Sequence, residues 1–174
     1  MSHLQQQQFC EKVKAQFPDR FRKKRVLDVG SFDINGNNKY LFENCGYIGI
    51  YLGPGKNVDI VCPVHEFVGS FETIISTEAF EHDPFFEMSF QRIVLDLLVP
   101  GGLFLFTCAT KGRPEHGTYQ STPHNAPFTN EHYKNISQDD IRATIDIDAV
   151  FERYEFGFCW RTRDLYFWGI KKWL

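Results

Sequence analysis

The stretch Val26-Leu27-Asp28-Val29-Gly30-Ser31, followed by a polar loop through Asp33 to Gly36, decides the fold. A short apolar, β-branched run ends at a glycine, and residues 37–43 then have the pattern of a helix. A strand that turns tightly into a helix points backbone N–H groups and a helix N-terminus at a ligand. Asp28 and Asp33 make this loop acidic, which suits a ligand that carries hydroxyls and an ammonium group. The loop lacks the full G-x-G-x-x-G of dinucleotide-binding proteins, and a plain structural turn remains the alternative.

Length and composition predict one globular domain over residues 1–174. Hydrophobic residues make up 43% of the chain and aromatic residues 16%, enough for a packed core. The net charge of -3 gives no reason to expect nucleic acid as a partner. The 5 cysteines are odd in number and include no C-x-x-C pair, so we expect reduced thiols in a cytoplasmic protein. No apolar run is long enough to cross a membrane, and the N-terminus is too polar for a signal peptide.

Strand and helix patterns alternate along the chain and predict an α/β fold with a mainly parallel sheet. Two final strands joined by a tight turn predict an antiparallel hairpin at one edge. Strands are expected at residues 25–29, 47–52, 58–62, 72–76, 103–108, 154–160 and 164–173. Helices are expected at about residues 3–17 with Ser2 as the cap, at 37–43, from Asp83-Pro84 to the Pro100-Gly101-Gly102 stop, and from Ser137 to about Val150.

The connection between the second and third expected strands is unusually short. Only residues 53–57 separate them, whereas a parallel crossover that contains a helix needs roughly a dozen residues. Either the helix is lost there or the third strand is vestigial. We therefore expect abbreviated helices around strands two to four.

The residues best suited to chemistry follow the fourth expected strand, at the carboxyl edge of the sheet where α/β proteins bind ligands. Glu78, Glu81 and His82 are spaced i, i+3 and i+4, so one helical turn would place all three on one side. Two carboxylates and an imidazole can bind a divalent metal or share acid–base work, and His82 can instead anchor the loop without metal. His116, in a later loop, is a further base or metal ligand, or a plain exposed histidine. The long segment 119–135 has the character of a lid over the substrate.

Several motifs together make the chain resemble a known family. They are the opening stretch, G-P-G at 53–55, S-T-E-x-x-E-H-D at 76–83, T-C-A-T-x-G-R-P-E-H-G-T at 107–118 and D-L-Y-F-W-G at 164–169. From about residue 25 to 172 the chain resembles the class I S-adenosylmethionine-dependent methyltransferases, in particular a small bacterial-type group without an assigned substrate. The resemblance implies a Rossmann-like sheet of seven strands, the last one antiparallel.

The resemblance also implies where S-adenosylmethionine binds. The loop after the first strand would hold the methionine end, and the segment after the third strand would meet the adenine. The cofactor-binding residues are then Asp28, Gly30, Ser31, Asp33, Gly36, Tyr51, Cys62, His65 and Thr77, and the catalytic residues are Glu78, Glu81, His82 and His116. A small-molecule methyl acceptor is favoured, with or without a divalent metal. The sequence does not indicate which acceptor, which acceptor atom or which oligomeric state.

Tyr51 departs from the family, whose members place an acidic side chain here to accept both ribose hydroxyls. A phenol offers one oxygen and no charge, which lowers affinity by roughly ten- to a hundredfold. Tyr51 can still bond one hydroxyl, Asp59 can compensate, or cofactor use is lost. Because Tyr51 replaces the acidic residue, a non-catalytic or degenerate cofactor-binding paralogue is the alternative function. A nicotinamide-dependent Rossmann enzyme fits less well, because it needs G-x-G-x-x-G and a helix after the second strand.

Overall fold

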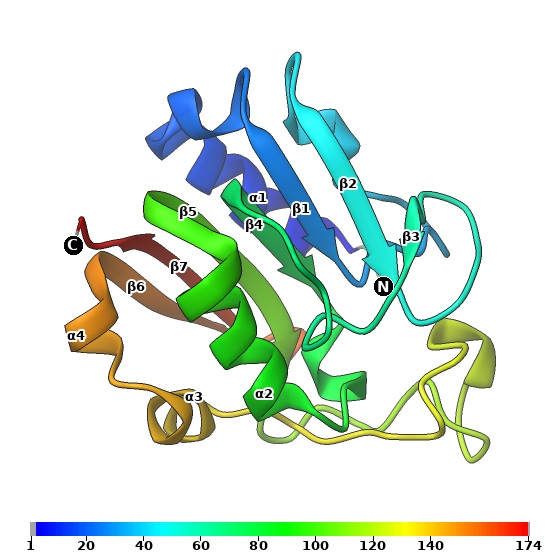
Figure 1. The fold of residues 1–174 in the computed structure, drawn as a ribbon. Helices are drawn as coiled ribbons and strands as arrows, with labels where there is room; N and C mark the ends of the chain where they lie inside the picture. Colours follow the sequence, from blue (N-terminus) through cyan, green and yellow to red (C-terminus); the bar gives the residue numbers. More distant parts are fainter. Residues whose placement is uncertain (1–2, 174) are drawn as a thin grey trace.

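The computed structural model describes residues 3–173 and contains one seven-stranded sheet in the order β3-β2-β1-β4-β5-β7-β6 (Figure 1). Neighbouring strands from β3 to β5 are parallel, whereas β7 is antiparallel to both β5 and β6. The predicted α/β fold with an antiparallel C-terminal hairpin is therefore confirmed. The strands are β1 Arg25–Val29, β2 Gly46–Tyr51, β3 Ile60–Val61, β4 Phe71–Thr77, β5 Leu98–Ala109, β6 Phe151–Cys159 and β7 Asp164–Lys171.

The central strands are buried on both faces because their side chains alternate between two hydrophobic clusters. In β1, Val26 packs into a cluster that also contains Cys10 and Val13 of helix α1, Leu4–Gln16. Leu27 packs into a second cluster on the opposite face, together with helix α2, Phe86–Gln91, and the π-helical turn η4, Arg92–Leu97. Figure 1 shows α1 behind the sheet and α2 in front of it.

Helix α1 begins where the sequence predicts, but its cap is His3, whose ring Nδ1 accepts a hydrogen bond from the backbone N of Gln6 at 3.2 Å. The predicted cap, Ser2, lies outside the described residues. His3 therefore sits at the start of the chain's first helix with its other ring nitrogen available to the rest of the molecule.

The half of the sheet around β2 and β3 is thinly covered, as the short connection predicts. Residues 52–59 contain no helix, and β3 shrinks to Ile60–Val61 instead of residues 58–62. The helix predicted at 37–43 is wrong, because only a single 3-10 turn forms there, η2, Lys39–Leu41. The side-chain amide of Asn37 donates to Asp33, and that of Asn38 donates to Asp28. Such side-chain hydrogen bonds compete with the backbone hydrogen bonds of a helix.

Three element boundaries also differ from the prediction. The Pro100-Gly101-Gly102 stop does not precede β5; it lies inside that strand, where the register with β4 shifts. The helix predicted after Asp83-Pro84 starts at Phe86, although its buried stripe is confirmed. The helix predicted from Ser137 to Val150 is split into α3, Gln138–Thr144, and α4, Ile147–Val150, because Asp146 caps a new helix.

The remaining short helices are 3-10 turns: η1 Pro18–Phe21, η3 Phe80–His82 and η5 Pro123–Asn125. No helix within residues 3–173 combines the length and the apolar character that crossing a bilayer requires.

Candidate active site

A cavity of about 400 Å³ opens at the carboxyl ends of β1, β2 and β4, the edge of an α/β sheet at which ligands bind. Its walls come from the loop after β1, the segment after β3, the segment after β4 and part of the segment 119–135. Of the predicted cofactor-binding residues, the ones that line it are Asp28, Gly30, Ser31, Gly36, Tyr51, Cys62, His65 and Thr77.

The loop after β1 is shaped by glycine, but its amides do not face a ligand as the sequence predicts. The N–H groups of Gly30 and Ser31 both donate to the Ile50 carbonyl, at 3.0 and 3.1 Å. The Gly36 N–H donates to Asp33 at 2.7 Å. Because no helix follows the loop, no helix N-terminus points into the cavity either. Side chains, more than backbone amides, therefore present the polar groups of this wall.

Asp28 is the acidic group at the base of the loop. It is 1% exposed, and its carboxylate accepts hydrogen bonds from the Tyr47 hydroxyl and from Asn38 Nδ2 at 3.2 Å. Asn38 also donates to Thr77 Oγ1 at 3.1 Å and thereby links the ends of β1 and β4. Burial raises the pKa of Asp28 to about 7, so a cationic ligand in the cavity would hold it ionised. Sequence reasoning missed Asn38, whose only signal is the asparagine pair at the end of the loop.

Asp33 does not line the cavity. Its carboxylate is bound within the loop by Asn37 Nδ2 and Lys56 Nζ, each at 2.9 Å, and by the Gly36 amide. The hydrogen bonds from Asn37 and Lys56 lower the pKa of Asp33. Asp33 therefore stabilises the conformation of the loop. Its carboxylate could contact a ligand only if these hydrogen bonds were broken.

Tyr51 reaches across the cavity mouth. Its hydroxyl donates to the Pro127 carbonyl at 2.6 Å, and its ring stacks on Phe32 at 5.4 Å between centroids. The phenol is therefore already bonded to the segment 119–135. Asp59, the predicted substitute, does not line the cavity, and its carboxylate accepts from the Gly49 amide at 2.7 Å.

The segment after β3 forms an aromatic corner of the cavity. His65 lines it and packs against Phe85, with ring centroids 4.6 Å apart, while Cys62 lies on the same wall. Phe85 is 51% exposed and presents a flat apolar face at the rim. Sequence reasoning did not single out Phe85, which falls within the helix predicted after Asp83-Pro84.

The segment after β4 does not form the helical turn that the i, i+3, i+4 spacing predicts. Glu78 has a left-handed backbone, with φ of 53°, and residues 80–82 form a 3-10 turn. The prediction that Glu78, Glu81 and His82 share one side is therefore wrong. Glu78 and His82 line the cavity, whereas Glu81 and His116 lie outside its lining.

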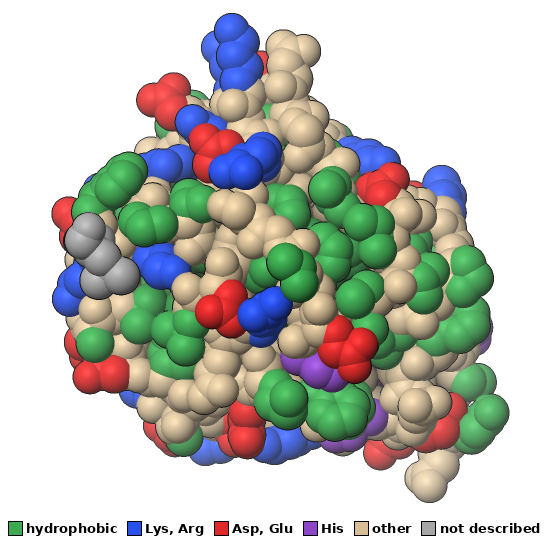
Figure 2. Space-filling model, viewed as in Figure 1, with side chains coloured by type: hydrophobic (Ala, Val, Ile, Leu, Met, Phe, Trp, Pro, Cys, Tyr) green, Lys and Arg blue, Asp and Glu red, His purple; other side chains and the backbone are tan. Residues whose placement is uncertain are grey.

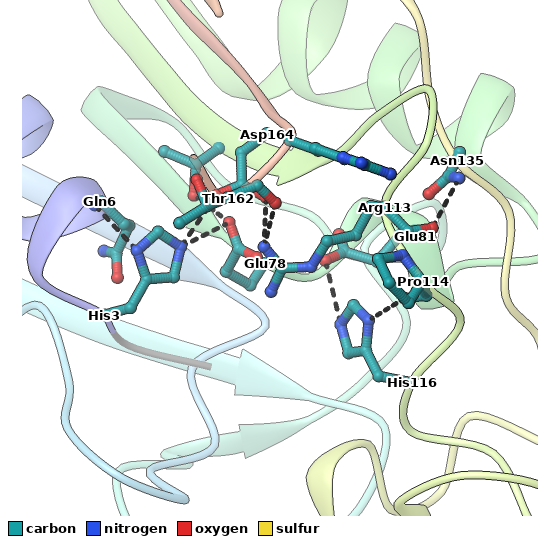
Figure 3. A network of polar contacts seen from close by, with 12 residues as sticks. His3, Gln6, Glu78, Glu81, Arg113, Pro114, His116, Asn135, Thr162 and Asp164 are labelled. Carbon is teal, nitrogen blue, oxygen red and sulfur yellow. Dashed lines mark hydrogen bonds and ion pairs between the residues drawn. The ribbon is translucent and has the colours of Figure 1, made fainter. Parts of the chain in front are cut away.

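Glu78 belongs to a buried polar network that joins the two ends of the chain (Figure 3). Its Oε1 accepts from Thr107 at 2.9 Å and lies 3.9 Å from His3 Nε2. His3 Nε2 is in turn 2.9 Å from Asp164, which also pairs with Arg113 at 2.9 Å. Burial raises the pKa of Glu78, and its Oε2 has no hydrogen-bond partner among the described residues. Arg113 and Asp164 belong to the motifs at 107–118 and 164–169, but nothing in the sequence places them, or His3, beside Glu78.

Glu81, His82 and His116 form a second buried group. One ligand atom from each of the three lies within 4.8 Å of the others. Burial raises the pKa of Glu81 to about 8 and lowers the pKa of His82 to about 3. Burial also lowers the pKa of His116. Burial therefore makes both imidazoles less basic than an exposed histidine, and His82 is a weak base.

Part of the segment 119–135 lines the cavity, through Asn125, Ala126, Phe128, Thr129 and Asn130, whereas its closure over a substrate stays a prediction. Tyr133 lies behind it, with its ring centroid 5.6 Å from that of His82 and 4.9 Å from that of His116. In the space-filling view, several histidine side chains surface close together low on the face shown, beside acidic and hydrophobic side chains (Figure 2).

Comparisons with known proteins identify the fold. No protein-family model matches the sequence, and no curated protein matches it. Among solved structures, the Burkholderia thailandensis 1,6-didemethyltoxoflavin-N1-methyltransferase, with bound 1,6-didemethyltoxoflavin and S-adenosylhomocysteine, has a TM-score of 0.65 at 16% identity. That match covers 96% of this chain and 78% of the other.

Two further structures agree. The N-terminal domain of EvdMO1, in the presence of SAH and D-fucose, has a TM-score of 0.66 at 13% identity, covering 99% of this chain and 85% of the other. Haemonchus contortus phosphoethanolamine N-methyltransferase 2, in complex with S-adenosyl-L-methionine, has a TM-score of 0.60 at 14% identity, covering 93% and 53%. At these identities the likeness is one of fold. The chain has the fold of class I S-adenosylmethionine-dependent methyltransferases.

Proposed function

We propose that the chain is an S-adenosylmethionine-dependent methyltransferase that acts on a small molecule. The observation that carries this proposal is the cavity at the carboxyl ends of β1, β2 and β4, walled by the buried carboxyl groups of Asp28 and Glu78. A ligand with an ammonium group and a sulfonium centre would supply the positive charge that two buried carboxylates need. The solved structures of the same fold support this choice, since several contain this cofactor or its product.

The cavity residues divide into those that would touch the cofactor and those that shape its site. Asp28, held by Asn38, and Thr77 face the place where the loop after β1 meets β4. Glu78 Oε2, which lacks a partner among the described residues, would accept a hydrogen bond from the ammonium group. Gly30, Ser31 and Gly36 shape the loop wall. Asp33 braces that loop from outside the cavity lining, and Cys62 with His65 would flank the adenine.

S-adenosylmethionine supplies a methyl group on a sulfonium ion, which an acceptor atom displaces in line. The protein must orient the acceptor and, for a hydroxyl or a protonated amine, remove a proton. His82 is poorly suited to proton removal, because burial lowers its pKa to about 3. His82 would then position the acceptor, with Glu81 and His116 supporting it from behind.

The character of the cavity supports a small, uncharged or cationic acceptor. A volume of about 400 Å³ is at the low end for small-molecule sites, so the cofactor would fill most of it. No lysine or arginine occurs among the described residues that line the cavity, so phosphate groups and nucleic acids would find no cationic partner there. A cytoplasmic location is still a prediction.

Calorimetric titration with S-adenosylhomocysteine, S-adenosylmethionine and NAD tests the proposal. We expect the first two to bind and NAD not to bind. Glu78→Gln should weaken binding by roughly tenfold or more, because it removes the charge opposite the ammonium group. Glu72→Gln is the matched control: Glu72 lies on strand β4, which ends just before Glu78, and is outside the cavity lining. Absence of binding by the unmodified chain would contradict the proposal.

The alternative is a non-catalytic cofactor-binding paralogue, and the Tyr51–Pro127 bond is the observation in its favour. It predicts binding of S-adenosylhomocysteine without turnover of S-adenosylmethionine on any acceptor of a small-molecule panel. If the wild type is active and the Glu81→Ala/His82→Ala variant keeps full turnover, then Glu81 and His82 have a purely structural role.

A further inference from the structure

Glu81 is a carboxyl group without a partner in the interior of the protein. Its side chain is 0% exposed, and neither Oε1 nor Oε2 has a well-formed hydrogen bond within residues 3–173, although the backbone N–H groups of Glu81 and Ala109 lie near enough to lower its pKa. Burying a carboxylate in this way is costly unless a cation compensates it. Protonation of Glu81 would satisfy only one of its oxygens, by donation to a nearby imidazole nitrogen, and would leave the other oxygen without a donor.

The two neighbouring histidines are oriented as metal ligands usually are. His82 Nδ1 lies 3.3 Å from the His132 carbonyl, and His116 Nδ1 lies 3.2 Å from the Pro114 carbonyl. A carbonyl oxygen only accepts, so each Nδ1 carries the ring proton and each Nε2 keeps a free lone pair. Metal-bound histidines commonly donate their second nitrogen to a backbone carbonyl in this manner, which fixes the tautomer and the ring.

The spacing of the donors fits one shared ion. Tetrahedral ligand atoms that each lie about 2.0–2.2 Å from a zinc ion are about 3.3–3.6 Å apart. His116 Nε2 is 3.8 Å from Glu81 Oε1, and Figure 3 shows the imidazole directed at that carboxylate. All three residues place one ligand atom within 4.8 Å of the others, so closure by up to about 1.5 Å brings them into range.

The backbone holds this group in place. Gly117 has φ of 74°, and a Cβ there would lie 2.7 Å from His82 Cε1, so glycine allows the loop to pack directly on the imidazole. The Tyr133 ring covers both histidines, and its hydroxyl donates to Asn135 at 2.8 Å. The loop and the Tyr133 ring therefore keep the three donors close to one another.

We propose that Glu81, His82 and His116 bind one divalent transition-metal ion of the zinc type. Two imidazoles and one carboxylate favour such an ion over magnesium, which prefers oxygen ligands and retains several waters. Three protein ligands leave a coordination position open. This site does not depend on the proposed methyltransferase activity, although His82 also lines the cavity and would connect the ion to it.

A second group of possible ligands, His3, Glu78 and Asp164, does not support the same inference. Arg113 already lies 2.9 Å from Asp164 and provides the positive charge that a metal would supply. Thr107 donates to Glu78, so that carboxylate is partly satisfied. The contrast between the two groups makes His3 a useful control residue.

Metal binding to the full chain tests the proposal without any substrate. The protein is stripped with a chelator and dialysed against zinc, and bound zinc is measured by mass spectrometry. Cobalt replaces zinc in a parallel sample, because its visible absorption reports the ligands. We expect one zinc per chain, a visible cobalt spectrum without a thiolate charge-transfer band, and no displacement by equimolar magnesium.

Substitutions then locate the ion. Zinc affinity should fall at least about 100-fold in Glu81→Gln and in His116→Gln, and stay within about threefold of wild type in His3→Gln. The proposal is overturned if wild-type protein binds no stoichiometric zinc, if both ligand variants bind it as tightly as wild type, or if a thiolate band places the metal on a cysteine. Binding of S-adenosylhomocysteine, measured on the same samples, tests the methyltransferase proposal separately and confirms that each variant is folded.

Discussion

Gly30→Ala should destabilise the protein by about 2–5 kcal/mol. Gly30 has φ of 82°, a left-handed conformation that costs a residue with a Cβ about 1–2 kcal/mol. The added Cβ would also lie 2.4 Å from the Ala79 Cβ, and overpacking of this kind costs about 1–3 kcal/mol. Ala79 cannot easily move, because the preceding Glu78 N–H is bonded to the Thr107 carbonyl at 2.8 Å.

A double-mutant cycle separates the two contributions. Ala79→Gly in the Gly30→Ala background removes the close contact and should restore about 1–3 kcal/mol of the free energy of unfolding. The added glycine itself costs about 0.5–1 kcal/mol, which is subtracted from this gain. Gly46→Ala is the matched control, since no heavy atom lies within 4 Å of its would-be Cβ. Free energies of unfolding come from urea denaturation followed by circular dichroism.

The cycle also revises why Gly30 matters for binding. The sequence suggests that a Gly30→Val side chain would fill the ligand's space, whereas the structure makes Ala79 the first obstacle. Gly30→Ala should therefore weaken S-adenosylhomocysteine binding by displacing the segment after β4, and Ala79→Gly should restore it. The reasoning is refuted if Gly30→Ala costs no more than Gly46→Ala, or if Ala79→Gly recovers neither stability nor binding.

Three further predictions follow from single residues. Tyr51→Asp should tighten S-adenosylmethionine binding by roughly tenfold in calorimetry through a restored carboxylate–hydroxyl pair, and unchanged or weaker binding would mean that the phenol is adapted to its bond with Pro127. Asp28 has a folded-state pKa of about 7 against 3.8 unfolded, so its contribution to stability is complete below about pH 4 and is lost as the pH rises to 7. Between pH 4 and 7 the free energy of unfolding should therefore decrease by up to about 4 kcal/mol less in Asp28→Asn than in wild type. The same decrease in both proteins would contradict the raised pKa of Asp28. Ser137→Ala should cost about 1 kcal/mol in urea denaturation, because Ser137 caps α3 in a reciprocal box with Asp140; a cost near zero would mean that water replaces the cap.

The sequence alone determines the order of the elements. Apolar runs at β1, β4 and β5 are long enough to be buried, and the terminal pair with its tight turn can only form a hairpin. The short connection at residues 53–57 excludes a crossover helix for a reason of length. The position of the cavity also follows, because parallel strands bring their carboxyl ends, and the loops after them, to one edge.

Tertiary structure decides what those loops do. Local spacing predicts a helix at residues 37–43, but the side chain of Asn38 bonds to Asp28 and Thr77 on two other strands. These partners are distant in sequence and cannot be read from a window around Asn38.

The grouping of the candidate site residues was also beyond the sequence. The i, i+3, i+4 argument assumes helical dihedrals, whereas the left-handed backbone at Glu78 turns its side chain toward His3 and leaves Glu81 with His82 and His116. A spacing rule is valid only within the local conformation it assumes. Sequence therefore determined which residues reach this edge of the sheet, and only long-range packing decided which of them meet.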